Sequence, residues 1–248
     1  MSKQIKLISK KVLNLIIEKT GFDLYGFKLY ASKDNMYYFT RNVNERTDII
    51  SFSSCMSSYD KEKLVVIWYT AKVVFNEINL LFDKAKISEI DMWWNYDYLS
   101  TGSYVTCISH PDLNPKKNTQ VFVPQIKPYN ADKSINHEGL DKLCTVLRTD
   151  LEDVFLPFFD LFPTLQSVND DIVEKYSSWM ELREFIPGNF GVKKMAIMAI
   201  CGNPHYLDYI QEYESIIRDN INVDRERNLL FLEFFLRLKN VIADRYNV

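Results

Sequence analysis

The period of the apolar positions changes near residue 130. Before that point, short runs rich in aromatic and β-branched residues are separated by polar turns, a pattern typical of β-strands. The short links between these runs favour an antiparallel meander. The expected strands lie at 24–30, 36–42, 48–53, 64–75, 90–98, 104–108 and 120–123.

A helix is expected ahead of these strands. Apolar residues such as Ile8, Val12 and Leu15 recur at helical spacing within residues 1–19, but lysines interrupt them throughout. A secretory signal needs about 7–15 uninterrupted apolar residues, and a membrane span needs about 18. Because neither pattern occurs, we expect a soluble cytoplasmic protein that begins with a surface helix.

Helical spacing dominates from residue 134 onward. Leu140, Leu143 and Leu147 mark the buried side of one helix. Pro157 is expected to end that helix, because proline disfavours helical backbone at the residue before it. Asn169 is expected to cap a second helix, since its side chain can accept a hydrogen bond from a free backbone N–H.

Further helices are expected toward the C-terminus. A helix over 192–201 should end at Gly202, where a residue without Cβ suits a left-handed cap. Asn203 and Pro204 then favour the start of a new helix. The last helix, at about 224–245, is apolar nearly all round, so we expect it at the centre of the helical half.

Together these patterns predict an α+β fold. The N-terminal helix is expected to lie on an antiparallel β-sheet within residues 1–130, and an all-helical half follows within residues 134–248. A chain of 248 residues is long enough to bury one large core. We therefore expect the two parts to behave as one cooperative unit.

Charge is distributed unevenly along the chain. The net charge is −3, but residues 1–86 hold 14 basic and 9 acidic side chains, and residues 134–248 hold 12 and 19. The two regions either attract each other within one fold, or the acidic helices dock a basic partner. The overall balance lacks the basic excess of a nucleic-acid-binding protein.

Composition restricts the chemistry that the chain can perform. Seven glycines are too few for a Gly-rich phosphate loop, and none of the known loop motifs occurs. The four cysteines are far apart and form no C-x-x-C pair, which favours reduced thiols over zinc ligands or disulfides. Two acidic pairs, Asp150 with Asp153 and Asp170 with Glu174, share helix faces but lack the E-x-x-H motif of carboxylate-bridged metal sites. We expect no metal and no cofactor.

The most unusual local cluster contains Asp91, Trp93, Trp94 and Tyr96. On a strand, Asp91 and Trp93 share one face and Trp94 points to the other. An exposed indole beside a carboxylate and a tyrosine makes a plausible binding surface, because Trp and Tyr dominate interface hot spots. The alternative is that helices cover both faces and the two tryptophans belong to the core.

Several of these segments together resemble a group of bacterial domains of unknown function. The segments are Gly21 with Phe22, Arg41, residues 48–54 (DIISFSS), residues 91–94 (DMWW) and residues 156–159 (LPFF). Some neighbours of that group look like immunity or accessory proteins encoded beside bacterial toxins. The resemblance implies a bacterial origin and the α+β fold, and it carries no catalytic residue.

These observations favour a non-enzymatic protein-recognition module, immunity-like or accessory in a bacterium. The expected partner is another protein, and the expected binding residues are Asp91, Trp93, Trp94, Tyr96 and Arg41. One alternative is a hydrolase whose site is assembled from dispersed residues around Asp91 and His110, with Asp112 beside the histidine. A second alternative is a helical adaptor or structural protein.

Overall fold

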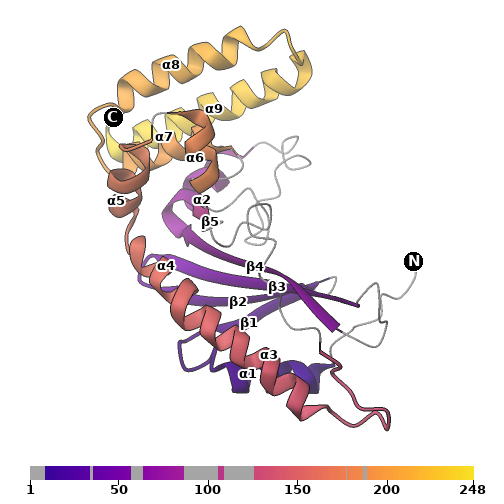
Figure 1. Ribbon diagram of the computed structural model, residues 1–248. Coiled ribbons are helices and arrows are strands. Elements are labelled where there is room, and N and C mark those ends of the chain that lie inside the picture. Colours follow the sequence, from indigo (N-terminus) through magenta and orange to yellow (C-terminus); the bar gives the residue numbers. More distant parts are fainter. Residues whose placement is uncertain are drawn as a thin grey trace. The chain divides into compact units, whose positions relative to one another are not determined.

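The computed structural model describes residues 9–33, 36–56, 64–86, 106–108, 126–176, 178–186 and 189–248 (Figure 1). Helix α1 (Lys10–Thr20) precedes an antiparallel sheet, and helices follow through the C-terminal half. The α+β fold expected from the sequence is confirmed. The strands expected at 90–98 and 120–123 lie outside the described residues.

The described sheet is a meander in which each strand pairs with its neighbour in the chain. Its order is β1 (Lys28–Lys33), β2 (Met36–Val43), β3 (Arg46–Met56), β4 (Leu64–Phe75) and β5 (Thr106–Ile108). In the antiparallel β1–β2 ladder, Leu29 pairs with Phe39 and Ala31 with Tyr38. Tyr30 is therefore an extra residue on β1, which forms a β-bulge.

The first strand begins later than expected. Residues 21–26 form turns instead, because Gly21 and Gly26 adopt left-handed backbone with φ of 71° and 81°. The N–H of Phe27 donates to the carbonyl of Phe22 at 2.9 Å and closes this segment. The prediction of a strand over 24–30 was therefore wrong at its start, because β1 begins only at Lys28, after the second glycine.

Eight further α-helices and two π-helical turns are described. The α-helices are α2 (Asn76–Ala85), α3 (His137–Asp150), α4 (Leu156–Leu161), α5 (Leu165–Val168), α6 (Trp179–Phe185), α7 (Phe190–Ile200), α8 (Tyr206–Asp219) and α9 (Arg225–Tyr246). The π-helical turns are η2 (Leu151–Phe155) and η3 (Asn169–Val173). None of the described helices combines the length and apolar character that crossing a bilayer requires.

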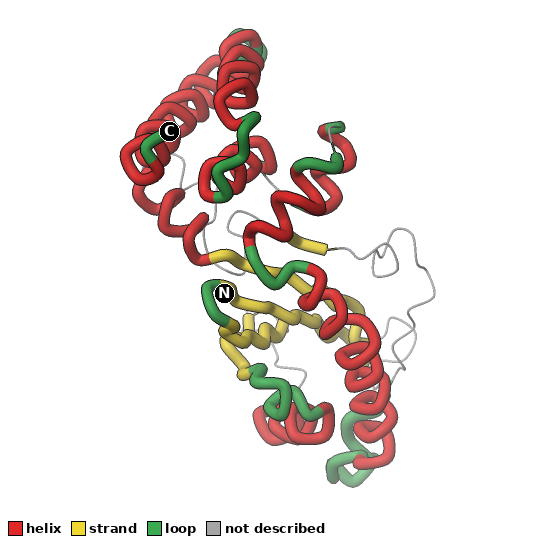
Figure 2. Tube along the Cα trace, turned by 90° about the vertical axis from the view of Figure 1, so that its left-hand side faces the viewer, coloured by secondary structure: helices red, strands yellow, loops and turns green. Residues whose placement is uncertain are grey.

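Contacts divide the chain into two compact units. Of the described residues, those within 1–43, 47–72 and 108–161 form unit 1, and those within 44–46, 73–107 and 162–248 form unit 2. Helices α3 and α4 thus group with the sheet, whereas the sequence pattern places a boundary at 130–134. The physical reason is that α3 packs against α1, and Figure 1 labels the two helices beside each other. Figure 2 shows the described helices and strands in a view turned by 90°.

Unit 1 has an aromatic core. Phe39 of β2 lies between Phe22 and Phe52, with ring centroids 4.7 Å and 5.6 Å away. Phe27 contacts Phe159 of α4 at 5.8 Å. All five rings are almost completely buried. The core therefore joins three parts of unit 1: the turn segment of residues 21–26, which we call the glycine turn, the sheet, and α4.

Unit 2 is built around α7, of which eight residues are buried. Helices α2, α8 and α9 each contact α7, and Phe82 of α2 meets Phe234 of α9 edge-to-face at 5.8 Å. In α9 the buried residues lie only between Leu232 and Ile242, and Leu229 is 45% exposed. The last helix is less buried than its composition suggested, and α7 takes the central place.

Pro157 does not end a helix, contrary to the expectation. It lies in α4, and the π-helical turn η2 joins α3 directly to α4. Within η2 the N–H of Leu156 donates to the carbonyl of Leu151, five residues earlier. This wider turn shifts the hydrogen-bond ladder, so Pro157 occupies a first-turn position where its missing N–H costs little.

Asn169 does not cap a helix either. Thr164 caps α5 in a capping box with Ser167. Asn169 is buried at the start of η3, and its side-chain oxygen accepts a hydrogen bond from Asn203 at 2.9 Å. Asn203 also accepts from the N–H of His205, so α8 begins at Tyr206, two residues later than expected.

Candidate functional site

The structure places one of the expected binding residues, Arg41. Asp91, Trp93, Trp94 and Tyr96 lie outside the described residues. The same is true of His110 and Asp112, the remaining residues of the hydrolase alternative. Beside Arg41, the described residues form two candidate surfaces: a polar depression on unit 1 and an acidic face of α8 in unit 2.

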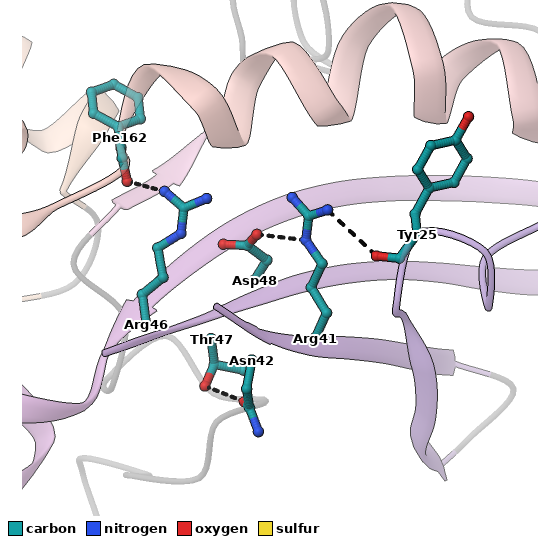
Figure 3. Close-up of polar contacts among 7 residues, drawn as sticks. All are labelled: Tyr25, Arg41, Asn42, Arg46, Thr47, Asp48 and Phe162. Atoms are coloured by element: carbon teal, nitrogen blue, oxygen red, sulfur yellow. Dashed lines mark hydrogen bonds and ion pairs between the residues drawn. The ribbon is translucent and has the colours of Figure 1, made fainter. Parts of the chain in front are cut away.

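Arg41 lies between β3, the glycine turn and α4 (Figure 3). Its Nε donates to Asp48 Oδ2 at 2.8 Å, and its Nη1 donates to the carbonyl of Tyr25 at 3.5 Å. The guanidinium carbon lies 4.8 Å from the ring centre of Phe27 and 5.3 Å from that of Phe159. The Asp48 side chain is 0% exposed and that of Arg41 is 16% exposed. These contacts give Arg41 a structural role inside unit 1.

A second buried arginine stabilises unit 2. Arg46 is 4% exposed, and its Nη1 donates to the backbone carbonyl of Phe162 (Figure 3). The N–H of Asn76, at the start of α2, donates to the carbonyl of Glu45 at 3.2 Å. The short segment 44–46 is thereby fixed to residues more than 30 positions further along the chain.

A depression of about 340 Å³ lies on unit 1 between α1 and α3. Two ion pairs are at its edge: Lys19 with Asp141 at 2.5 Å, and Arg148 with Glu152 at 3.8 Å. The hydroxyl of Tyr25 donates to Glu152 at 2.8 Å. The complete lining is Lys19, Asp141, Cys144, Thr145, Arg148, Thr149 and Glu152.

The thiol at this depression is unreactive. Cys144 is 3% exposed, and burial raises the pKa of its thiol to about 11. Burial likewise raises the pKa of the Cys201 thiol to about 12. Because nucleophilic attack requires the thiolate, neither cysteine is activated at neutral pH.

One face of α8 is acidic and exposed. Asp208, Glu212, Ser215 and Asp219 follow steps of four, three and four residues, so they form one stripe along the helix. Leu207 lies beside the stripe and is 56% exposed. The opposite side of α8 buries Tyr206, Ile210, Tyr213 and Ile217. We call the exposed side, formed by Leu207, Asp208, Glu212, Ser215 and Asp219, the α8 face.

The cations near the α8 face are engaged elsewhere. Arg218 and Lys239 both bind Glu214, at 2.7 Å and 3.0 Å. The ammonium of Lys194 lies 4.8 Å from the ring centre of Tyr209, and its charge is attracted by Glu174 and Glu212 without a direct ion pair to either. Within the part of the chain that the structure describes, the three carboxylates of the α8 face have no ion pair.

Asp150 is a partly buried carboxylate at the end of α3. Its Oδ2 is buried and has no hydrogen-bond partner among the described residues. Burial, and then the charge of Asp153, raise the pKa of Asp150 to about 6. Because the folded-state pKa lies above the unfolded one, the protonated form favours folding, and this stabilisation is lost as pH rises from about 4 to about 6.

Asp150→Asn should therefore stabilise the protein at pH 7, by about 1 kcal/mol after allowance for the remaining solvent contact. Thermal unfolding measured from pH 4 to pH 8 checks this, and the gain over the native chain should shrink toward pH 4. Asp160→Asn, at an exposed position, is the control and should change little. If Asp150→Asn stabilises the protein equally at pH 4 and pH 8, a raised pKa of Asp150 is not the cause.

The described residues contain no group of three His, Cys, Asp or Glu side chains placed to hold a metal ion. Comparisons of the chain with protein-family models, with curated protein sequences and with solved structures found no match.

Proposed function

We propose that this chain is a non-enzymatic protein-binding module whose α8 face receives a basic partner. The observation that carries the proposal is the stripe of exposed carboxylates at Asp208, Glu212 and Asp219, which have no ion pair among the described residues. Such a stripe attracts and orients a complementary basic surface and so accelerates association.

Leu207 supports the same interpretation. Charge complementarity sets orientation and association rate, whereas affinity depends mainly on apolar groups that lose water on binding. Leu207 is a large apolar side chain held open to solvent at the end of the stripe, at 56% exposure. A partner that covers both groups is expected to carry lysine or arginine residues around an apolar contact.

Three of the described polar groups are poorly placed for catalysis, which supports a binding role. The thiols of Cys144 and Cys201 are protonated at neutral pH, and the carboxylate of Glu214 is occupied by Arg218 and Lys239. The resemblance to toxin-linked bacterial domains supports a narrower proposal. In that version the partner is a bacterial protein, the setting is the cytoplasm, and the role is immunity-like or accessory.

Charge reversal on the α8 face tests the proposal. The variant Asp208→Lys, Glu212→Lys and Asp219→Lys should lose the proteins that the native chain retains from a bacterial lysate, identified by cross-linking and mass spectrometry. The control reverses three exposed acids of unit 1, Glu18, Asp23 and Asp160, and changes the net charge equally. Far-UV circular dichroism establishes that both variants are folded.

The control variant should keep the retained proteins, and added salt should weaken their binding to the native chain. Equal losses from both variants would show that net charge, and not the α8 face, determines retention. Turnover of a small molecule by the purified chain, unaffected by the α8 variant, would favour the hydrolase alternative instead.

A further inference from the structure

We infer that the depression between α1 and α3 binds a small zwitterion, either a free α-amino acid or a dipeptide. The inference concerns unit 1 and is independent of the proposed role of the α8 face. It rests on three observations: the balanced charges of the lining, the hydrogen-bonding groups that Arg148 and Glu152 leave unused, and the size of the depression.

The lining is electrically balanced. Lys19 and Arg148 contribute positive charges, and Asp141 and Glu152 contribute negative ones. A ligand with a large net charge would meet as much repulsion as attraction there. A ligand that carries one ammonium and one carboxylate finds a complement for each.

Arg148 is the group that suits the carboxylate. Its nearest anionic atom, Oε1 of Glu152, is 3.8 Å from Nε, which is longer than a hydrogen bond. No described residue accepts a hydrogen bond from this guanidinium. Its planar donor groups are suited to bind a carboxylate through two parallel hydrogen bonds.

Gly21 allows Arg148 to hold this position. A Cβ atom at residue 21 would lie 2.9 Å from Nη2 of Arg148, and the φ of 71° also favours glycine. The guanidinium therefore lies directly over the end of α1. A side chain at residue 21 would occupy part of this position beside the depression.

Glu152 is suited to bind the ammonium. The Tyr25 hydroxyl donates to its Oε1 and fixes the carboxylate next to Arg148. The ammonium and carboxylate of one α-amino acid are also neighbours, so a single molecule can contact both residues. The Tyr25 hydroxyl and Nε of Arg148 both face Oε1 of Glu152. Oε2 of Glu152 and the Nη groups of Arg148 therefore remain for the ammonium and the carboxylate of one ligand.

The remainder of the depression is polar and small. Thr145 donates its hydroxyl to the carbonyl of Asp141 at 2.9 Å, which leaves its oxygen able to accept. The Lys19–Asp141 pair lies at the α1 side. A volume of about 340 Å³ is at the lower end of the range for small-molecule sites. Beyond the ammonium and carboxylate, this volume has room for the polar side chain of an amino acid or for the second residue of a dipeptide.

Nuclear magnetic resonance titration of the full chain tests this inference. The probes are L-glutamine and glycyl-L-glutamine, with sodium acetate and methylammonium chloride as the separate charged halves. Both zwitterions should shift the amide signals of Thr145 and Thr149 and the Nε–H signal of Arg148. Arg148→Gln and Glu152→Gln should each weaken binding about tenfold, as loss of one charge-assisted contact implies.

Lys142→Gln is the matched control, because Lys142 is an exposed α3 residue outside the depression, paired with Glu138. It should leave the affinity unchanged. Arg148→Lys keeps the positive charge but loses the planar guanidinium, so it should also weaken binding. An NMR spectrum that is otherwise unchanged shows that this variant is folded and that only binding is affected. The inference fails if neither zwitterion shifts these signals, if acetate alone is equally effective, or if Lys142→Gln matches Arg148→Gln.

Discussion

Asp48→Ala should lower the free energy of unfolding by about 3–5 kcal/mol, the usual cost of breaking a buried ion pair from one side. The Arg41 guanidinium would stay between Phe27 and Phe159 with its carboxylate partner gone. Denaturation by urea, followed by circular dichroism, measures the loss. It should appear as a lower midpoint with little change in slope.

A double variant separates the ion pair from packing. Arg41→Met with Asp48→Leu replaces both charges by apolar groups of similar size, and it should recover most of the lost stability. Glu138→Ala removes an exposed pair with Lys142 and should cost far less than Asp48→Ala. If the double variant is as unstable as Asp48→Ala, the uncompensated charge is not the cause.

Gly191→Ala should destabilise unit 2 by about 3 kcal/mol, although alanine ordinarily stabilises a helix by about 1 kcal/mol relative to glycine. A Cβ atom at residue 191 would lie 2.3 Å from both Cζ and Oη of Tyr213. That ring cannot withdraw easily, because it stacks on Tyr209 and meets Phe235 edge-on, each at 5.7 Å. Differential scanning calorimetry measures the effect.

Shortening the opposing side chain provides the internal check. In the Gly191→Ala background, Tyr213→Leu should restore part of the lost stability, since it removes the ring atoms that the new methyl group meets. On its own, Tyr213→Leu should destabilise the protein by opening a cavity. A stable Gly191→Ala variant would show that α7 and α8 are packed less closely than the structure indicates.

Local signals in the sequence predicted much of the fold. The strands from 36 to 75 and the last helix were visible because β-branched runs and helical spacing depend on neighbouring residues. The end of the helix near Gly202 follows from one residue, whose φ is 61°. Pro157 and Asn169 were misread because their outcomes depend on distant contacts. The π-helical turn absorbs the proline, and Asn203, 34 residues away, binds Asn169.

The candidate surfaces differ in how far the sequence could predict them. The α8 stripe was visible in principle, because Asp208, Glu212 and Asp219 already have helical spacing in the sequence. The depression was not, since Lys19 and Asp141 are 122 residues apart and meet only after α1 and α3 pack. Arg41 was predicted as a binding residue, and that stays a prediction. Its ion pair with Asp48 could not be predicted, because it depends on the pairing of two strands.

The bulge at Tyr30 has a consequence for how the molecule behaves at high concentration. β1 is the terminal strand of the described sheet, and a terminal strand presents backbone groups to which strands of other molecules can add. The extra residue breaks the regular spacing of those groups, and the exposed Lys28 places a charge beside them. Both features oppose the addition of a foreign strand at this edge, so we expect the concentrated protein to resist aggregation through β1.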